Sequence, residues 1–304
     1  MLNTSIKAMM AVGALVSIAG CKSTIESYVE NEVGDRLNDM AGDRLYLAHG
    51  DTTLNGRVRS GTMSTDGDGY VTSERLEAAR NGSLEIGTNV GELEELAMNN
   101  GSWTARFNAN GGDRIDDGMD SLVITSRSSN GERRGWMGNA DALDFDHQTF
   151  GMWATGVGTS NGSVNVGSFG SRTAAADVPS SGSATYSGRS VGMVVTTDGR
   201  ALVAESQVGV STSDFSSVSV ASTNTYVNNL SGGNAWRGAH LDFAGTGTVD
   251  GNGFSANING VVAFSATSTG TMDGSFYGDN AEEVGGTFEM NGAIGNYTGA
   301  FGAD

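Results

Sequence analysis

The chain has 304 residues, of which 47 are glycine, one is proline and one is cysteine, and its formal net charge is −18 at pH 7. This length allows one or two domains with a substantial buried core, and the glycines follow no Gly-X-Y period, which excludes collagen. The acidic balance repels a phosphate backbone and excludes nucleic acid as a partner. Short alternating apolar runs separated by Gly, Ser, Thr and Asn predict an all-β protein.

Residues 1–20 have the pattern of a secretory signal peptide. Lys7 precedes an apolar run over residues 8–16, which is too short to span a bilayer. The tetrapeptide Ile-Ala-Gly-Cys that ends at Cys21 resembles a bacterial lipobox, which implies that Cys21 becomes the lipid-modified first residue of the mature chain. An ordinary signal peptide with an incidental cysteine is the alternative. In the lipoproteins resembled, Lys22 implies the outer membrane rather than the inner membrane.

Two segments follow before the clearest strands begin. Residues 21–50 are predicted to be a tether with a short amphipathic helix, because apolar residues recur at helical spacing between Ile25 and Leu37. Residues 51–144 are predicted to form a small, irregular β-rich subdomain, since short strand-like segments alternate there with glycine-rich loops.

One segment of this subdomain is similar to a calcium-binding loop. Asp66, Asp68 and Gly69 fit positions 3, 5 and 6 of the twelve-residue pattern. Ser64 and Arg75 occupy positions 1 and 12, so two acidic ligands are missing. This favours a glycine-rich turn with solvated aspartates, and calcium bound by Asp66 and Asp68 is the alternative.

Residues 145–304 are predicted to form an eight-stranded antiparallel β-barrel, because eight strands enclose an interior that side chains just fill. Polar residues on the outward face, such as Thr185 and Asn257, predict a soluble barrel rather than a membrane-spanning one. Long loops are expected over 158–181 and 212–238. The predicted strands are 145–157, 183–194, 202–210, 240–249, 254–264 and three more after residue 270.

The C-terminal region carries a family resemblance. The runs Gly-Ser-Phe-Tyr-Gly over 274–278, Ala-Glu-Glu-Val-Gly-Gly-Thr-Phe over 281–288 and Gly-Ala-Phe-Gly over 299–302 resemble the closing signature of the transferrin-binding protein B-like surface lipoproteins. The resemblance implies an eight-stranded soluble barrel preceded by a handle-like subdomain. Full-length members have two lobes, whereas this sequence predicts one. Single-lobe relatives include factor H-binding proteins and haem-capturing, hemophilin-like proteins.

Candidate contact residues lie mainly in the expected 212–238 loop. Tyr226, Trp236 and Arg237 belong to the residue types favoured as anchors in protein interfaces. His147 is a candidate haem or metal ligand, against the alternative of a histidine on a strand face or rim. Three histidines and one cysteine leave little for catalysis, so we expect no enzymatic activity.

These observations predict a lipid-anchored outer-membrane protein at the cell surface. The resemblance implies a binding module for a host or environmental protein or an iron- or haem-carrying ligand, with an outer-membrane translocon or transporter as a further partner. A structural envelope lipoprotein without a ligand is the alternative. No cofactor is predicted, and haem is kept as an open possibility.

Overall fold

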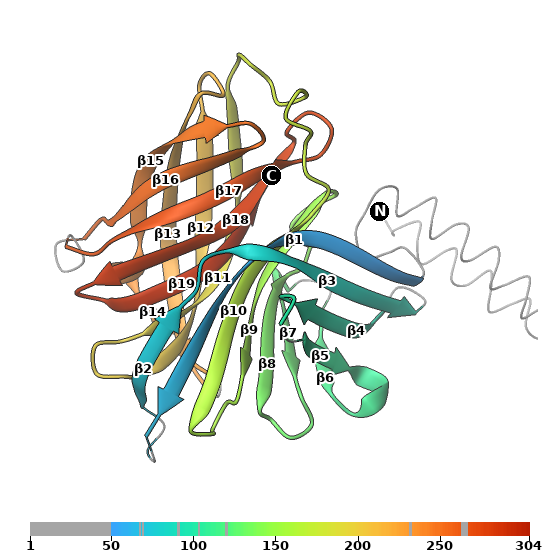
Figure 1. The fold of residues 1–304 in the computed structure, drawn as a ribbon, viewed down its shortest axis with the longest axis vertical. Helices are drawn as coiled ribbons and strands as arrows, with labels where there is room; N and C mark the ends of the chain where they lie inside the picture. The colour runs from blue at the N-terminus through green and yellow to red at the C-terminus, as the bar shows by residue number, and fades with distance from the viewer. Residues whose placement is uncertain are drawn as a thin grey trace, which may run out of the picture. The chain divides into compact units, whose positions relative to one another are not determined.

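The computed structural model describes residues 50–304 except 67, 69, 90, 91, 103, 119, 120, 231, 232 and 263–266. The expected signal peptide, the lipid-modified Cys21 and the short helix lie outside the described residues. The described residues belong to one compact unit and form two antiparallel sheets (Figure 1). Within them, no helix has the length and apolar character needed to cross a membrane.

The N-terminal sheet, here called the handle sheet, contains ten strands in the order β5-β4-β3-β1-β10-β9-β8-β7-β6, with β2 paired to β1. A single turn of 3-10 helix, Ala109–Gly111, follows β5. The strands are β1 (Gly50–Thr65), β2 (Val71–Leu76), β3 (Arg80–Asn89), β4 (Glu92–Asn99), β5 (Thr104–Asn108), β6 (Arg114–Asp116), β7 (Val123–Arg127), β8 (Arg133–Gly138), β9 (Gln148–Thr155) and β10 (Asn161–Gly170).

The second sheet closes on itself as an eight-stranded barrel, because β11 pairs with β19 and β12 pairs with β13. The two-residue strand β14 (Trp236–Arg237) adds to β13, and a 3-10 turn, Ala239–Leu241, follows it. The barrel strands are β11 (Ala184–Val195), β12 (Ala201–Thr212), β13 (Ser217–Asn229), β15 (Phe243–Asp250), β16 (Gly253–Gly260), β17 (Thr269–Tyr277), β18 (Glu283–Gly292) and β19 (Gly295–Ala303).

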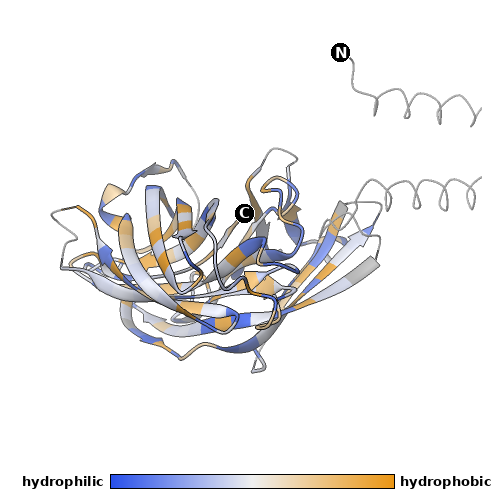
Figure 2. Cartoon of the chain, turned by 90° about the horizontal axis from the view of Figure 1, so that it is seen from above, coloured by the Kyte–Doolittle hydropathy of each residue, from blue (hydrophilic) through white to orange (hydrophobic). Residues whose placement is uncertain are grey.

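Aromatic side chains fill the barrel interior and glycines make room for them. The rings of Phe288 and Tyr297 lie 4.9 Å apart between centroids, and Phe288 also contacts Phe243 at 5.1 Å. A Cβ on Gly299 would lie 2.4 Å from the Phe288 ring, so the large side chain needs the glycine opposite it. Figure 2 shows the underlying pattern, in which polar and apolar residues alternate along the strands.

The handle sheet packs against the outside of the barrel at two glycines, Gly285 and Gly302, here called the glycine floor. Gly285 of β18 and Gly302 of β19 are paired in register. Cβ atoms there would lie 2.4 Å from the Gln148 side-chain amide, 2.6 Å from Ser168 Oγ and 2.6 Å from the Phe150 ring. Figure 1 shows β9 and β10 beside β18 and β19. The second sheet can approach this closely only because two adjacent barrel strands lack side chains at this point.

Polar contacts fix the two sheets in register at the edges of this floor. Arg59 of β1 reaches the barrel wall and pairs with Glu289 at 2.7 Å and with Asp273 at 3.3 Å. Buried Gln148 donates through Nε2 to the Val284 carbonyl at 3.2 Å. A charged side chain with partners on both β17 and β18 ties the handle sheet to one position on the barrel.

Glu283, at the start of β18, makes a further tie and is 2% exposed. Its Oε1 accepts hydrogen bonds from the backbone N–H groups of Asp146, at 2.6 Å, and His147, at 2.9 Å. Burial raises the pKa of Glu283 to about 7, and the charges of Asp304 and Asp146 add to this, while the two N–H groups oppose it.

The structure corrects three of the predicted segments. The strand expected over 145–157 is β9, which belongs to the handle sheet and not to the barrel. The loop expected over 158–181 contains β10, and the loop expected over 212–238 contains β13 and β14. β9 is buried on both faces, so no alternation reveals its sheet, and β13 exposes Ser, Thr and Asn, which are typical of loops. The subdomain expected to be small is also larger, since it is a ten-stranded sheet.

Filling the glycine floor should destabilise the protein. We expect Gly302→Ala to lower the free energy of unfolding by about 1–3 kcal/mol, because the new methyl group has to displace Gln148 and Phe150 in a packed interface. Gly209→Ala on β12 is the matched control, since the nearest atom to its Cβ would be 3.9 Å away. Urea unfolding measures both, and equal stabilities would contradict the proposed role of the floor.

The raised pKa of Glu283 predicts a pH dependence of stability. Because the folded state holds the proton more tightly than the unfolded state, stability should fall as pH rises from 4.5 to about 7, by about 3 kcal/mol at most. Glu283→Gln removes this titration and should be more stable than the parent protein at pH 8. Exposed Glu132→Gln serves as the charge-matched control. The assignment would be contradicted if the free energies of unfolding of the parent protein and of Glu283→Gln changed with pH in parallel.

Candidate functional site

Two exposed aromatic side chains come from the neighbouring strands β13 and β14. Tyr226 is 51% exposed and Trp236 is 39% exposed. Short strand β14 pairs with β13 so that Arg237 lies opposite Tyr226 and Trp236 lies opposite Val227. The pairing places three residues that the sequence analysis singled out on adjacent strands, with Tyr226 and Arg237 on one face of the pair and Trp236 on the other. We call Tyr226, Trp236 and Arg237 the aromatic patch.

Arg237 holds the aromatic patch in place. Its guanidinium donates from Nη2 to Asp242 Oδ2 at 2.6 Å and from Nη1 to the Thr225 carbonyl at 2.6 Å. The hydrogen bond with Asp242 raises the pKa of Arg237 above its ordinary value. The guanidinium carbon lies 5.9 Å from the centre of the Tyr226 ring, within the range of a cation–π contact. With these contacts made, Arg237 acts chiefly as a brace for Tyr226 and the β13–β14 pair.

Asp242 is the residue of this site that sequence reasoning missed. Its side chain is largely buried and accepts hydrogen bonds from the backbone N–H and the hydroxyl of Thr225, at 3.0 and 2.6 Å, as well as from Arg237. The sequence places Asp242 on the outward face of a strand, where a solvated carboxylate is expected. Its partners come from β13 and β14, which the sequence analysis assigned to a loop.

His147 does not join the aromatic patch. It precedes β9, its backbone N–H donates to Glu283, and its imidazole lies against Gly278 at the end of β17. It thus belongs to the contact between the handle sheet and the barrel, whereas the aromatic patch is carried by β13 and β14.

The Asp66 and Asp68 segment forms a turn before β2. Asp66 Oδ1 accepts hydrogen bonds from the backbone N–H groups of Asp68, at 3.0 Å, and Tyr70, at 2.9 Å. Within the described part of the chain, no group of three or more His, Cys, Asp or Glu residues is arranged to hold a metal ion. Calcium binding at Asp66 and Asp68 stays a prediction.

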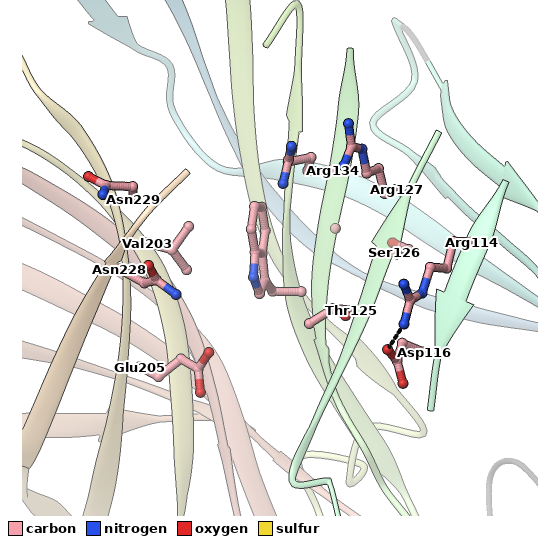
Figure 3. Close-up of a pocket in the computed structure, with 12 residues that line it drawn as sticks. Arg114, Asp116, Thr125, Ser126, Arg127, Arg134, Val203, Glu205, Asn228 and Asn229 are labelled. Carbon is pink, nitrogen blue, oxygen red and sulfur yellow. Dashed lines mark hydrogen bonds and ion pairs between the residues drawn. The ribbon is translucent and has the colours of Figure 1, made fainter. Parts of the chain in front are cut away.

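A groove of about 340 Å³ opens beside the aromatic patch, between the handle sheet and the barrel (Figure 3). Its barrel wall includes Glu205, which is paired in register with Tyr226, so the groove and the aromatic patch adjoin. Burial of its carboxylate raises the pKa of Glu205, and the charge of Arg189 opposes this. On the opposite wall lie Arg114 and Asp116 of β6, with side chains of β7 and β8.

Comparison with known proteins identifies the barrel. Residues 178–304 match the family model described as the C-lobe and N-lobe beta barrels of Tf-binding protein B. No curated protein gives a significant match to the sequence.

Among solved structures, a mutant of transferrin-binding protein B from Haemophilus parasuis Hp5 is 14% identical, with 83% of this chain and 76% of that chain covered and a TM-score of 0.44. A mutant of the same protein from Actinobacillus pleuropneumoniae H49 is 12% identical, with 83% and 99% covered and a TM-score of 0.42. A protein described only as a surface lipoprotein is 13% identical, with 82% and 98% covered and a TM-score of 0.40.

Breaking the brace should destabilise this part of the barrel. We expect Asp242→Ala to lower the free energy of unfolding by about 2–4 kcal/mol, because the Arg237 and Thr225 donors lose a largely buried charged acceptor. Exposed Asp250→Ala on β15 is the control and should change stability by less than about 0.5 kcal/mol. Urea unfolding monitored by circular dichroism makes the comparison, and a loss no larger than that of the control would contradict the brace.

Proposed function

Because residues 178–304 form a β-barrel domain of the transferrin-binding protein B type, we propose that this chain is a lipid-anchored outer-membrane protein that binds a protein partner at the cell surface. In this proposal Cys21 carries the lipid, and the barrel with its handle sheet presents the binding surface. The partner class that we propose is an iron- or haem-carrying protein, following the transferrin binding in the name of the barrel family.

The observation that carries this proposal is the aromatic patch. Trp and Tyr are the side chains most often found as energetic anchors of protein interfaces, and here both are exposed on paired strands, one on each face of the pair. The pairing of β14 and the ion pair between Arg237 and Asp242 fix them in place before a partner arrives. An anchor that is already ordered loses little conformational entropy on binding.

His147 gives less support to direct haem capture. Its backbone is engaged by Glu283 and its ring lies against Gly278, at the contact between the handle sheet and the barrel. We therefore favour a protein partner over free haem. An outer-membrane transporter or translocon is a further proposed partner, because a surface-anchored binding protein needs a route outward and a recipient for its cargo.

The aromatic patch can be tested by substitution in the full chain displayed on cells. We expect Tyr226→Ala with Trp236→Ala to weaken binding to an iron-carrying serum protein at least about tenfold, since each loses a large interface anchor. Tyr70→Ala is the matched control, because Tyr70 is 43% exposed but lies outside the aromatic patch. Flow cytometry with labelled transferrin, lactoferrin and haemoglobin provides the measurement.

The outcomes separate the proposals. Binding lost in the double variant but kept in Tyr70→Ala supports the aromatic patch, and binding kept in both contradicts it. If none of the three proteins binds, the structural envelope lipoprotein becomes the better account. Palmitate labelling of the same cells, with Cys21→Ser for comparison, tests the anchor separately.

A further inference from the structure

Two arginines face each other across neighbouring strands at the edge of the groove. Arg127 of β7 and Arg134 of β8 are paired in antiparallel register, and both line the groove. Like charges directly opposite each other on a sheet destabilise it. Among the described residues, neither guanidinium has a carboxylate partner, although Arg59, Arg106 and Arg133 of the same sheet all form ion pairs. The chain has 35 acidic and 17 basic residues, so carboxylates that could neutralise such a pair are abundant.

The surroundings of Arg134 make this arrangement more costly. Its Nε is buried and has no hydrogen-bond partner. Burial lowers the pKa of Arg134, and the charge of Arg127 adds to this effect. A buried donor without an acceptor costs free energy, and here it belongs to a charged group. Both effects would be relieved by an anion between the two guanidinium groups.

The rest of the groove mixes apolar and polar residues, with Trp136 and Val203 in its lining, and its third arginine, Arg114, is paired with Asp116. Figure 3 shows Arg127 and Arg134 toward one end, with Asn229 on the facing barrel strand, and Glu205 and Asp116 toward the other end. Asp116 is paired with Arg114 at 2.8 Å, whereas Glu205 makes no ion pair among the described residues, although the charge of Arg189 acts on it. Asn228 and Asn229 of β13 offer amide donors and acceptors on the barrel side.

We propose that the groove binds a ligand with a single oxyanion group, a carboxylate or a phosphate, which Arg127 and Arg134 hold together. Guanidinium groups match both anions with paired N–H donors. Glu205 disfavours further negative charge at the far end, so the remainder of the ligand is neutral or cationic. A volume of about 340 Å³ admits a molecule of tripeptide size. This site stands independently of the partner proposed for the aromatic patch.

Three probes distinguish the sources of the oxyanion. Inorganic phosphate represents a free anion, triglycine supplies a carboxylate at the end of a neutral chain with an amine, and triglycine amide lacks that carboxylate. Titration calorimetry on the full chain in detergent should detect phosphate, triglycine or both, with triglycine amide at least about tenfold weaker than triglycine. Binding of phosphate alone assigns a free inorganic anion, and binding of triglycine alone assigns the end of a peptide chain.

Substitution of the arginines tests the assignment. Arg127→Gln with Arg134→Gln should weaken binding at least about tenfold. Arg57→Gln with Arg200→Gln removes the same charge at exposed positions elsewhere and should leave binding unchanged. Without ligand, the groove variant should melt at or above the parent temperature, because repulsion between the arginines is removed. The single variant Arg127→Gln, at an exposed position, provides the same test if the double variant does not fold.

The proposal is overturned by any of three results. The first is that neither phosphate nor triglycine binds the parent protein. The second is that binding survives in the groove variants. The third is that the charge-matched control loses binding equally. A groove variant that melts well below the parent would also count against it, because the arginine pair would then stabilise the fold itself.

Discussion

The close approach of two sheets over the pair Gly285 and Gly302 is the constraint on which the rest of this structure depends. A barrel needs no second sheet for its own closure, and a handle sheet of ten strands needs a surface against which to bury its apolar face. Side-chain-free positions on adjacent barrel strands let Gln148, Phe150 and Ser168 reach the barrel backbone. The ion pairs of Arg59 then fix the register of one sheet on the other. The groove is lined by residues of β6 to β8 on the handle side and of β12 and β13 on the barrel side.

Much of the barrel could be predicted from the sequence, because its strands alternate strongly. The strands at 243–250, 253–260 and 283–292 follow patterns in which every second residue is apolar or glycine. β13 escaped prediction because its exposed positions are Ser, Thr and Asn, and the buried valines between them were too sparse to outweigh this composition. β9 was assigned to the wrong sheet because a strand covered on both faces carries no sign of which neighbours it has.

The candidate site was only half accessible to sequence reasoning. Tyr226, Trp236 and Arg237 could be chosen as residue types suited to recognition, and the structure places them on the paired strands β13 and β14. The brace of Asp242 and the unneutralised pair of Arg127 and Arg134 could not be found in this way, because both depend on cross-strand register. A carboxylate seventeen residues from Thr225 along the chain gives no local pattern that would reveal their contact.

The closure of the barrel has a consequence for the order in which the protein can be built. One edge of β11 is hydrogen-bonded to β19, so Val195 stays unpaired until Asn296 is available. One edge of β1 likewise pairs with β10, about a hundred residues further along the chain. Most strands pair with a neighbour in sequence, as β11 does with β12, so these two long-range edges are the ones left open longest. Contacts so distant in sequence form slowly, and exposed strand edges invite aggregation. One edge of β11 therefore stays exposed during folding until residues 295–303 are available.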